Sequence, residues 1–107
     1  MGARISFSQM SNVQLQTHIR RVAHSSGRVF FLKHAQLRMI ERGVNDLQVL
    51  ECLQHGLIQR PPKRDANTGE IRARMEHFGS ARNLSVVVAL DEQDPDLLVV
   101  TVITHTR

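Results

Sequence analysis

The run 34-HAQLRMIERGVNDLQVLECLQHGLI-58 carries the start and stop signals of two consecutive helices. Gly43 suits the left-handed conformation that commonly ends a helix, which predicts a first helix over residues 34–42. Asn45 is a favoured N-cap, because its side chain can accept a hydrogen bond from the first helical turn, and it predicts a second helix over residues 46–55. The middle of the chain is therefore expected to form two helices joined by a tight turn.

The apolar residues of these two helices indicate the sides that should pack on a core. In the first helix, Leu37 and Ile40 are expected to face the core, together with Val44 just beyond it. In the second helix, the expected core stripe consists of Leu47, Leu50, Cys52 and Leu53. Cys52 is then a small buried hydrophobe rather than a reactive thiol.

Downstream of residue 58 the periodicity changes from helix to strand. Residues 59–70 hold two prolines, a glycine and mixed charges, which predicts a loop. In 71-IRARMEHF-78 apolar and polar residues alternate, as in a strand with one buried face. The runs 83-NLSVVVAL-90 and 97-LLVVTVITH-105 are almost continuously apolar, which is typical of central strands or of strands covered by a partner chain. Residues 91–96 between them predict a short antiparallel connection.

Upstream, Ser8 or Ser11 can cap an N-terminal helix. The short run 28-RVFFL-32 follows a glycine and predicts either a strand or an extended lead-in to the next helix. A chain of 107 residues fits a single domain. We expect residues 1–27 to be a helical extension and residues 28–107 to be the core of that domain.

The order of elements, with helices first and strands second, predicts the α+β class. The N-terminal helices are expected to pack on one face of an antiparallel sheet of three to four strands. Arg72 and Arg74 alternate with the buried positions of their strand, so they are expected on the opposite face or its edge. The loop that contains Lys63 and Arg64 should lie close to them.

The charges are unevenly distributed along the chain. Residues 1–64 hold ten basic and three acidic residues, whereas residues 65–107 hold four basic and seven acidic ones. Twelve of the fourteen cations are arginine, which forms bidentate contacts with phosphate. A nucleic acid or another polyanion is a reasonable partner, although at a net charge of +4 these residues can simply serve solubility. Tryptophan and tyrosine are absent and only four phenylalanines are present, so an aromatic platform for base stacking is not expected.

The single cysteine rules out an internal disulfide, and a reducing compartment is expected. No apolar run approaches the roughly 20 residues that span a bilayer, and the N-terminal sequence MGARISFSQM is too polar for a secretory signal. A cytoplasmic protein without membrane association is therefore predicted. His18, His24 and His55 share no metal-ligand spacing with one another or with Cys52, so neither a metal site nor a cofactor is predicted.

His34, Arg38 and Arg42 stand at intervals of four and form a column that covers about 80° of the helix surface. Two arginines at this spacing repel each other by a few tenths of a kcal/mol, and a bound phosphate would reverse that cost. The alternative is an ordinary solvated face, because Glu41 is placed to form an ion pair with Arg38. His34 can also simply begin the helix.

The helical run resembles the signature of the DUF4258 family. It has a His-Ala start, an Arg-Met pair four residues after the histidine, a second arginine, a Gly-Val turn and a capped helix that ends near a glycine. The strands predicted over residues 71–78, 84–90 and 97–104 are similar in order to the rest of that family, so the resemblance covers residues 29–105. Families of this kind are similar to the RelE/barnase/colicin group of small metal-independent ribonucleases, often toxins of toxin–antitoxin pairs.

The resemblance implies RNA cleavage by attack of a 2′-hydroxyl on the adjacent phosphate, which needs a base, an acid and cations. His34 would transfer a proton, because an imidazole gains and loses one near neutral pH, and Arg38 and Arg42 would hold the phosphate. His105 is our own addition as a second proton-transfer group, although a residue so near the chain end can also be frayed surface. Further contacts to phosphate or substrate are expected from Arg74, Arg72, Lys63, Arg64 and Thr104.

Two functions stay open at this point. The first is a toxin-like, metal-independent endoribonuclease of a toxin–antitoxin system, with RNA as substrate and an antitoxin protein as partner. The alternative is a non-catalytic nucleic-acid-binding or protein-interaction module of the same fold. A homodimer fits either function, because a second chain could cover the apolar strands.

Overall fold

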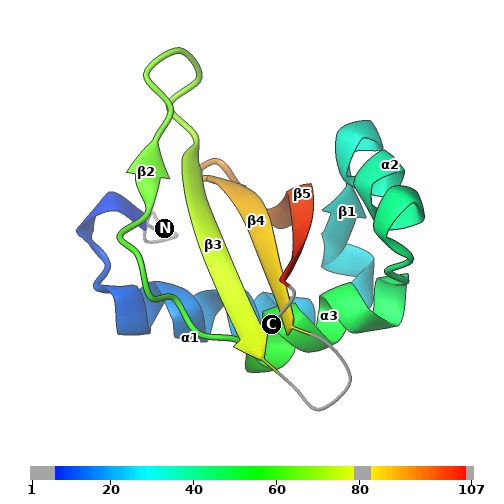
Figure 1. Ribbon diagram of the computed structural model, residues 1–107. Helices are drawn as coiled ribbons and strands as arrows, with labels where there is room; N and C mark the ends of the chain where they lie inside the picture. The colour runs from blue at the N-terminus through cyan, green and yellow to red at the C-terminus, as the bar shows by residue number, and fades with distance from the viewer. Residues whose placement is uncertain (1–6, 79–82, 106–107) are drawn as a thin grey trace.

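The computed structural model describes residues 7–78 and 83–105, so residues 1–6 of the expected N-terminal extension lie outside the described part of the chain. Figure 1 shows how the elements are arranged. In chain order they are η1 (Phe7–Gln9), α1 (Asn12–Ala23), η2 (Ser26–Arg28), β1 (Val29–Phe31), α2 (Lys33–Arg42), α3 (Asp46–His55), β2 (Lys63–Arg64), β3 (Ile71–Phe78), β4 (Asn83–Asp91) and β5 (Asp94–His105).

The strands form one five-stranded mixed sheet in the order β1-β5-β4-β3-β2 (Figure 1). Neighbours from β2 to β5 pair antiparallel, whereas β1 runs parallel to β5, with Val29 opposite Leu97. The α+β class is confirmed, but the sheet differs at both edges from the expected antiparallel sheet of three to four strands. A parallel neighbour needs a long crossover connection, and α2 and α3 lie within the one used here. The other edge strand, β2, comes from the segment predicted as a loop.

Helices α1 and α3 pack across one face of the sheet, while α2 stands beside β1 and β5 at the edge (Figure 1). The core between these layers includes fully buried side chains from both helices and from the central strands, among them Leu15, Ile19, Leu53, Met75 and Val86. The two almost continuously apolar runs became β4 and β5, next to each other inside the sheet. Their prediction as central strands is confirmed.

The apolar residues of α2 and α3 do not all face the core as expected. In α2 the small Ala35 is buried, whereas Leu37 and Ile40 are 51% and 79% exposed. This helix lies at the edge of the sheet and contacts it along a narrow face, which leaves its outer apolar residues in solvent. In α3 the buried stripe starts at Val49, so Leu47 falls on the outer side and is 75% exposed.

The predicted helix ends are confirmed. Ser11 and Asn45 cap α1 and α3, each in a capping box with a glutamine three residues further on, Gln14 and Gln48. Gly43 ends α2 with a φ of 64°, the left-handed conformation that glycine adopts at little cost.

Gly56 ends α3 for a different reason. Its φ of −74° is open to any residue, but a Cβ at this position would clash with the carbonyl oxygens of Cys52 and Glu76. The close approach lets Leu57 form two backbone hydrogen bonds with Glu76, both of 2.8 Å. These bonds fix the C-terminal half of β3 against the end of α3.

Cys52 is a buried small side chain, as expected, with no exposed surface. Burial raises the pKa of the Cys52 thiol to about 12. The thiol therefore stays protonated at neutral pH and does not supply the thiolate that cysteine chemistry requires.

His18 gives the fold a dependence on pH. The His18 side chain is only 9% exposed, its ring lies 5.0 Å from that of Phe7, and its Nε2 has no hydrogen-bond partner among the described residues. Burial, with Arg21 and Arg28 nearby, lowers the pKa of His18, so the folded state favours the neutral imidazole. Protonation then favours the unfolded state, and the free energy of unfolding should fall as the pH drops below the ordinary imidazole value.

We expect the thermal midpoint of the wild type to fall more steeply between about pH 7 and about pH 5 than that of His18→Leu. The measurement is thermal unfolding followed by circular dichroism at each pH. His24→Leu, which replaces the exposed histidine at the C-terminal end of α1, should keep the wild-type slope. Equal slopes for wild type and His18→Leu would contradict the assignment to His18.

Candidate active site

Three neighbouring strands bring a polar cluster to one face of the sheet. Glu76 of β3 lies opposite Ser85 of β4, and His105 pairs with the residue two positions before Ser85. Side chains alternate along a strand, so Arg74 and Glu76 lie on the face opposite that of Met75, which is buried under the helices. Arg74, Glu76, Ser85 and His105 together are called the sheet cluster below.

The sheet cluster is held together by short polar contacts. Ser85 Oγ lies 2.7 Å from His105 Nε2, and Arg74 Nη2 lies 3.4 Å from the same nitrogen. Arg74 Nη2 is also 3.8 Å from Glu76 Oε1. One guanidinium nitrogen therefore lies between a carboxylate and an imidazole.

Burial strengthens these contacts, because charges interact more strongly away from bulk water. Ser85 has no exposed surface, and the side chains of Glu76 and Arg74 are 9% and 22% exposed. The His105 ring is partly exposed. The buried Nε of Arg74 has no hydrogen-bond partner among the described residues, and such unsatisfied donors often mark places where a water or ligand completes the network.

The contacts also restrict which nitrogen of His105 can meet a substrate. Ser85 and Arg74 both contact Nε2, which leaves Nδ1 as the ring nitrogen that a substrate could contact. A hydroxyl can donate or accept, which lets Ser85 bond Nε2 in either protonation state of the ring. The full burial of Ser85 favours this orienting role over a role as an exposed nucleophile.

The helix column does not gather around one hollow. His34 is exposed in the first turn of α2, and Arg38 forms an ion pair of 2.6 Å with Glu41, the partner suggested by the sequence. The hollow beside α2, of about 270 Å³, is lined by residues such as Gln36 and Ile40, and it opens on the other side of the helix.

Arg42 is the member of the column that reaches the sheet. It is close in angle to the buried Ala35 around the helix, and its Nη1 donates a hydrogen bond of 3.4 Å to the carbonyl of Val102 on β5. Val102 is three residues before His105 on the same strand. No hydrogen bond or ion pair joins His34 to the sheet cluster within the described part of the chain.

The other residues expected to contact phosphate do not all lie on the face of the sheet that carries the sheet cluster. Arg72 lies on the same face of β3 as Arg74, about 6.6 Å further along the strand, and Lys63 of β2 is opposite it. Arg72 and Arg64 are 3.9 Å and 4.0 Å from the carboxylates of Asp65 and Glu92. Thr104 immediately precedes His105 on β5, so it points to the opposite face of the sheet from His105.

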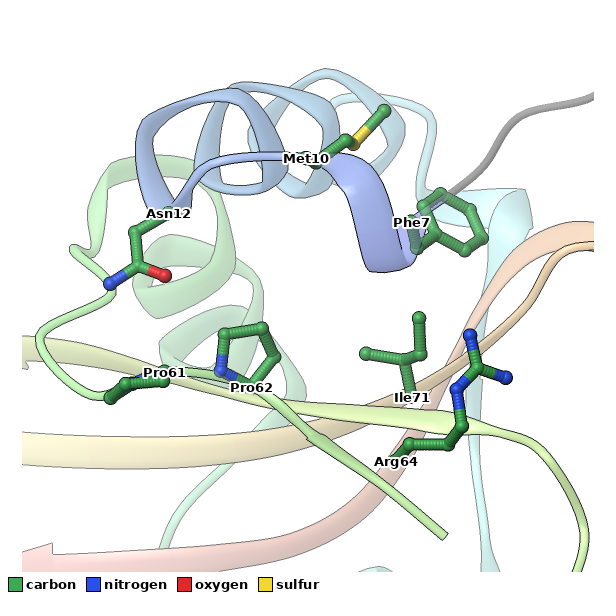
Figure 2. Close-up of a pocket in the computed structure, with 7 residues that line it drawn as sticks. All are labelled: Phe7, Met10, Asn12, Pro61, Pro62, Arg64 and Ile71. Carbon is green, nitrogen blue, oxygen red and sulfur yellow. The ribbon is translucent and has the colours of Figure 1, made fainter. Parts of the chain in front are cut away.

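A second hollow lies at the other end of β3, between the N-terminal segment and the loop before β2 (Figure 2). It has a volume of about 290 Å³, and Figure 2 shows Phe7 and Met10 on one side with Pro62 and Ile71 on the other. Arg64 is the only titratable side chain among its lining residues, so the hollow offers no acid–base pair.

The acidic residues of the C-terminal half are largely at the end of the sheet away from His105. β4 ends at Asp91, Glu92 lies in the turn that follows, and β5 begins at Asp94 and ends at His105. Arg28 binds Asp96 at 3.1 Å, next to this turn. A polyanion approaching the sheet cluster therefore avoids most of the negative charge on the sheet.

Two members of the sheet cluster, Glu76 and Ser85, were missed by sequence reasoning. The alternation that placed Arg72 and Arg74 on one face of the strand places Glu76 there as well, so the sequence pattern could have predicted its position. Ser85 lies inside an apolar run, and its position depends on the register between β3 and β4. Only a correct register of the hairpin would have brought it next to Glu76.

Three histidines from different elements also lie near one another, with ring centroids 6.4 Å apart for His24 and His55 and 6.3 Å apart for His55 and His77. Among residues 7–78 and 83–105, no three His, Cys, Asp or Glu side chains are placed to hold one metal ion. In the same part of the chain, no helix has the length and apolar character needed to cross a membrane.

Residues 31–104 match the family model described as a domain of unknown function, DUF4258. The chain belongs to the DUF4258 family. The match agrees with the resemblance inferred over residues 29–105 and includes α2, α3 and all strands except the start of β1 and the end of β5. No curated protein gives a significant match, and no solved structure does. The family description names no activity, so function has to be argued from the geometry of the site.

Proposed function

We propose that this DUF4258 protein is a metal-independent endoribonuclease that cleaves RNA at the sheet cluster. The observation that carries the proposal is the position of Arg74 Nη2, 3.8 Å from the Glu76 carboxylate and 3.4 Å from His105 Nε2. A cation flanked by a carboxylate and an imidazole provides the three groups needed for attack of a 2′-hydroxyl on the adjacent phosphate.

In this mechanism Glu76 takes the proton of the 2′-hydroxyl as the 2′-oxygen bonds to phosphorus. The bond between phosphorus and the 5′-oxygen breaks, and the leaving oxygen takes a proton from Nδ1 of His105. Arg74 stabilises the negative charge of the phosphorane, and the contact of the Ser85 hydroxyl with Nε2 holds the imidazole in place. The products are a 2′,3′-cyclic phosphate and a 5′-hydroxyl, so the step needs neither water nor an oxidant.

The helix column has a supporting place in this proposal. Arg42 already contacts β5 three residues before His105, so it is the column residue best placed to bind a phosphate next to the scissile one. Arg72 and Lys63 extend the positive surface along β3 in the other direction. His34 and Arg38 would act only if the RNA follows α2. A toxin-like role with an antitoxin partner follows from the resemblance to toxin ribonucleases.

The test is an assay of the purified protein on a labelled RNA in the presence of excess chelator, with an all-2′-deoxy strand of the same sequence as control. We expect the protein to cleave the RNA but not the deoxy strand, and we expect mass spectrometry to identify 2′,3′-cyclic phosphate and 5′-hydroxyl ends. RNA binding without cleavage would support the non-catalytic alternative. Cleavage of the deoxy strand would exclude the 2′-hydroxyl mechanism.

A further inference from the structure

We infer that Phe78 is a stacking surface for one nucleobase and that it restricts the site to single-stranded RNA. The inference rests on the proposed function, since it places the base next to the scissile phosphate. It concerns which RNA the sheet cluster accepts, and the proposed mechanism assigns no role to Phe78.

Phe78 has the position and the exposure that stacking requires. It is the last residue of β3, on the same face as Arg74 and Glu76, and it is 58% exposed. Its ring centroid is 5.8 Å from that of His105, and the two rings meet edge to face at 78°. The proposed proton donor and an open aromatic surface are therefore neighbours.

The exposure of Phe78 distinguishes it from the core phenylalanines. Phe7 is 1% exposed and belongs to the core, and Phe31 is partly buried against it. Phe30 is also exposed, at 48%, but it lies on β1, and β5 and β4 separate β1 from β3 in the sheet. Phe78 is thus the exposed aromatic residue beside the sheet cluster, where the sequence composition had argued against any stacking platform.

Stacking on a side chain requires a base with a free face. In a duplex both faces of each base are covered by its neighbours, whereas bases of loops and single strands can turn out and stack on aromatic rings. Every base has such a face, so the contact selects for single strands without selecting strongly for sequence. RNA hairpins should accordingly be cut in the loop and not in the stem.

The absence of tryptophan from the chain allows a direct test. Phe78→Trp introduces a single fluorophore at the proposed surface, and Phe30→Trp introduces the same fluorophore at the other exposed phenylalanine. The probe is an unstructured 2′-O-methyl oligonucleotide, which cannot undergo attack by a 2′-hydroxyl. We expect the oligonucleotide to quench the fluorescence of Phe78→Trp, to leave that of Phe30→Trp unchanged, and to lose its effect when annealed to its complement.

A second variant measures the contribution to affinity. Phe78→Leu keeps an apolar side chain against His105 but removes the aromatic face, and we expect it to bind the same oligonucleotide about fivefold more weakly or worse. Wild-type affinity of Phe78→Leu, or equal quenching of Phe78→Trp by single and double strands, would overturn the inference. Quenching by a protein that cleaves no RNA would support the stacking surface and reject the nuclease. RNA cleavage by the wild type, together with unchanged binding by Phe78→Leu, would support the nuclease and reject the stacking surface.

Discussion

His105→Gln should lower the rate of RNA cleavage by about 10²- to 10⁴-fold, the usual contribution of a general acid or base. In the proposed mechanism the imidazole protonates the leaving 5′-oxygen, and an amide cannot replace it. Glutamine can still bond the Ser85 hydroxyl, which has no exposed surface and would otherwise be left unsatisfied at a cost of about 1–3 kcal/mol. The measurement is the single-turnover rate on labelled RNA, together with the thermal midpoint as a check on folding.

Two further histidine variants make the result specific. His24→Gln changes an exposed histidine at the end of α1 and should cleave at the wild-type rate. His34→Gln tests the helix column, because His34 is the proton-transfer residue implied by the family resemblance. Loss of cleavage in His34→Gln with full activity in His105→Gln would place the reaction on α2 and reject the sheet cluster.

The parts of the fold that follow from local rules were predictable from the sequence. Ser11, Asn45 and Gly43 act within one helical turn, and the helix boundaries they imply agree with the structure to within one or two residues. The alternation in Ile71–Phe78 likewise defined β3 with its observed bounds. The parallel pairing of β1 with β5 was not predictable in this way. It joins residues 29–31 to residues 97–99, and three hydrophobic residues carry no information about so distant a neighbour.

The candidate site shows the same division. The sequence identified Arg74 and His105 individually, from alternation and from position at a strand end. The structure brings them within 3.4 Å of each other because β4 separates their strands and sets the register of both. The regular spacing of His34, Arg38 and Arg42 was the more visible pattern. Spacing on one helix shows which residues are neighbours, but not whether they share a cavity. Here His34 is exposed, Arg38 pairs with Glu41, and Arg42 contacts the sheet.

Arg74→Lys should lower the cleavage rate by about 10²-fold, close to the effect of removing one donor that stabilises a transition state. Lysine keeps a positive charge near Glu76, so the buried carboxylate retains a counter-charge and the protein should fold. A single ammonium cannot occupy the Nη2 position between Glu76 and His105 and also present further donors to the phosphate, as a guanidinium can. The matched control is Arg72→Lys, on the same strand and face. It should weaken RNA binding modestly, because lysine keeps the charge but loses the bidentate contact with phosphate, and it should leave the single-turnover rate at saturating protein unchanged.

Removal of the charge separates catalysis from stability at the same position. Arg74→Met leaves the Glu76 carboxylate, which is 9% exposed, without its nearest cation, and it should lower the free energy of unfolding by roughly 1–3 kcal/mol. The double variant Arg74→Met/Glu76→Gln removes the unpaired charge and should recover most of that stability. It should still fail to cleave RNA, because both the proposed base and the proposed phosphate-binding cation are gone. Recovery of cleavage together with stability would mean that Arg74 only supports the fold, and the active site would then have to be sought elsewhere on the molecule.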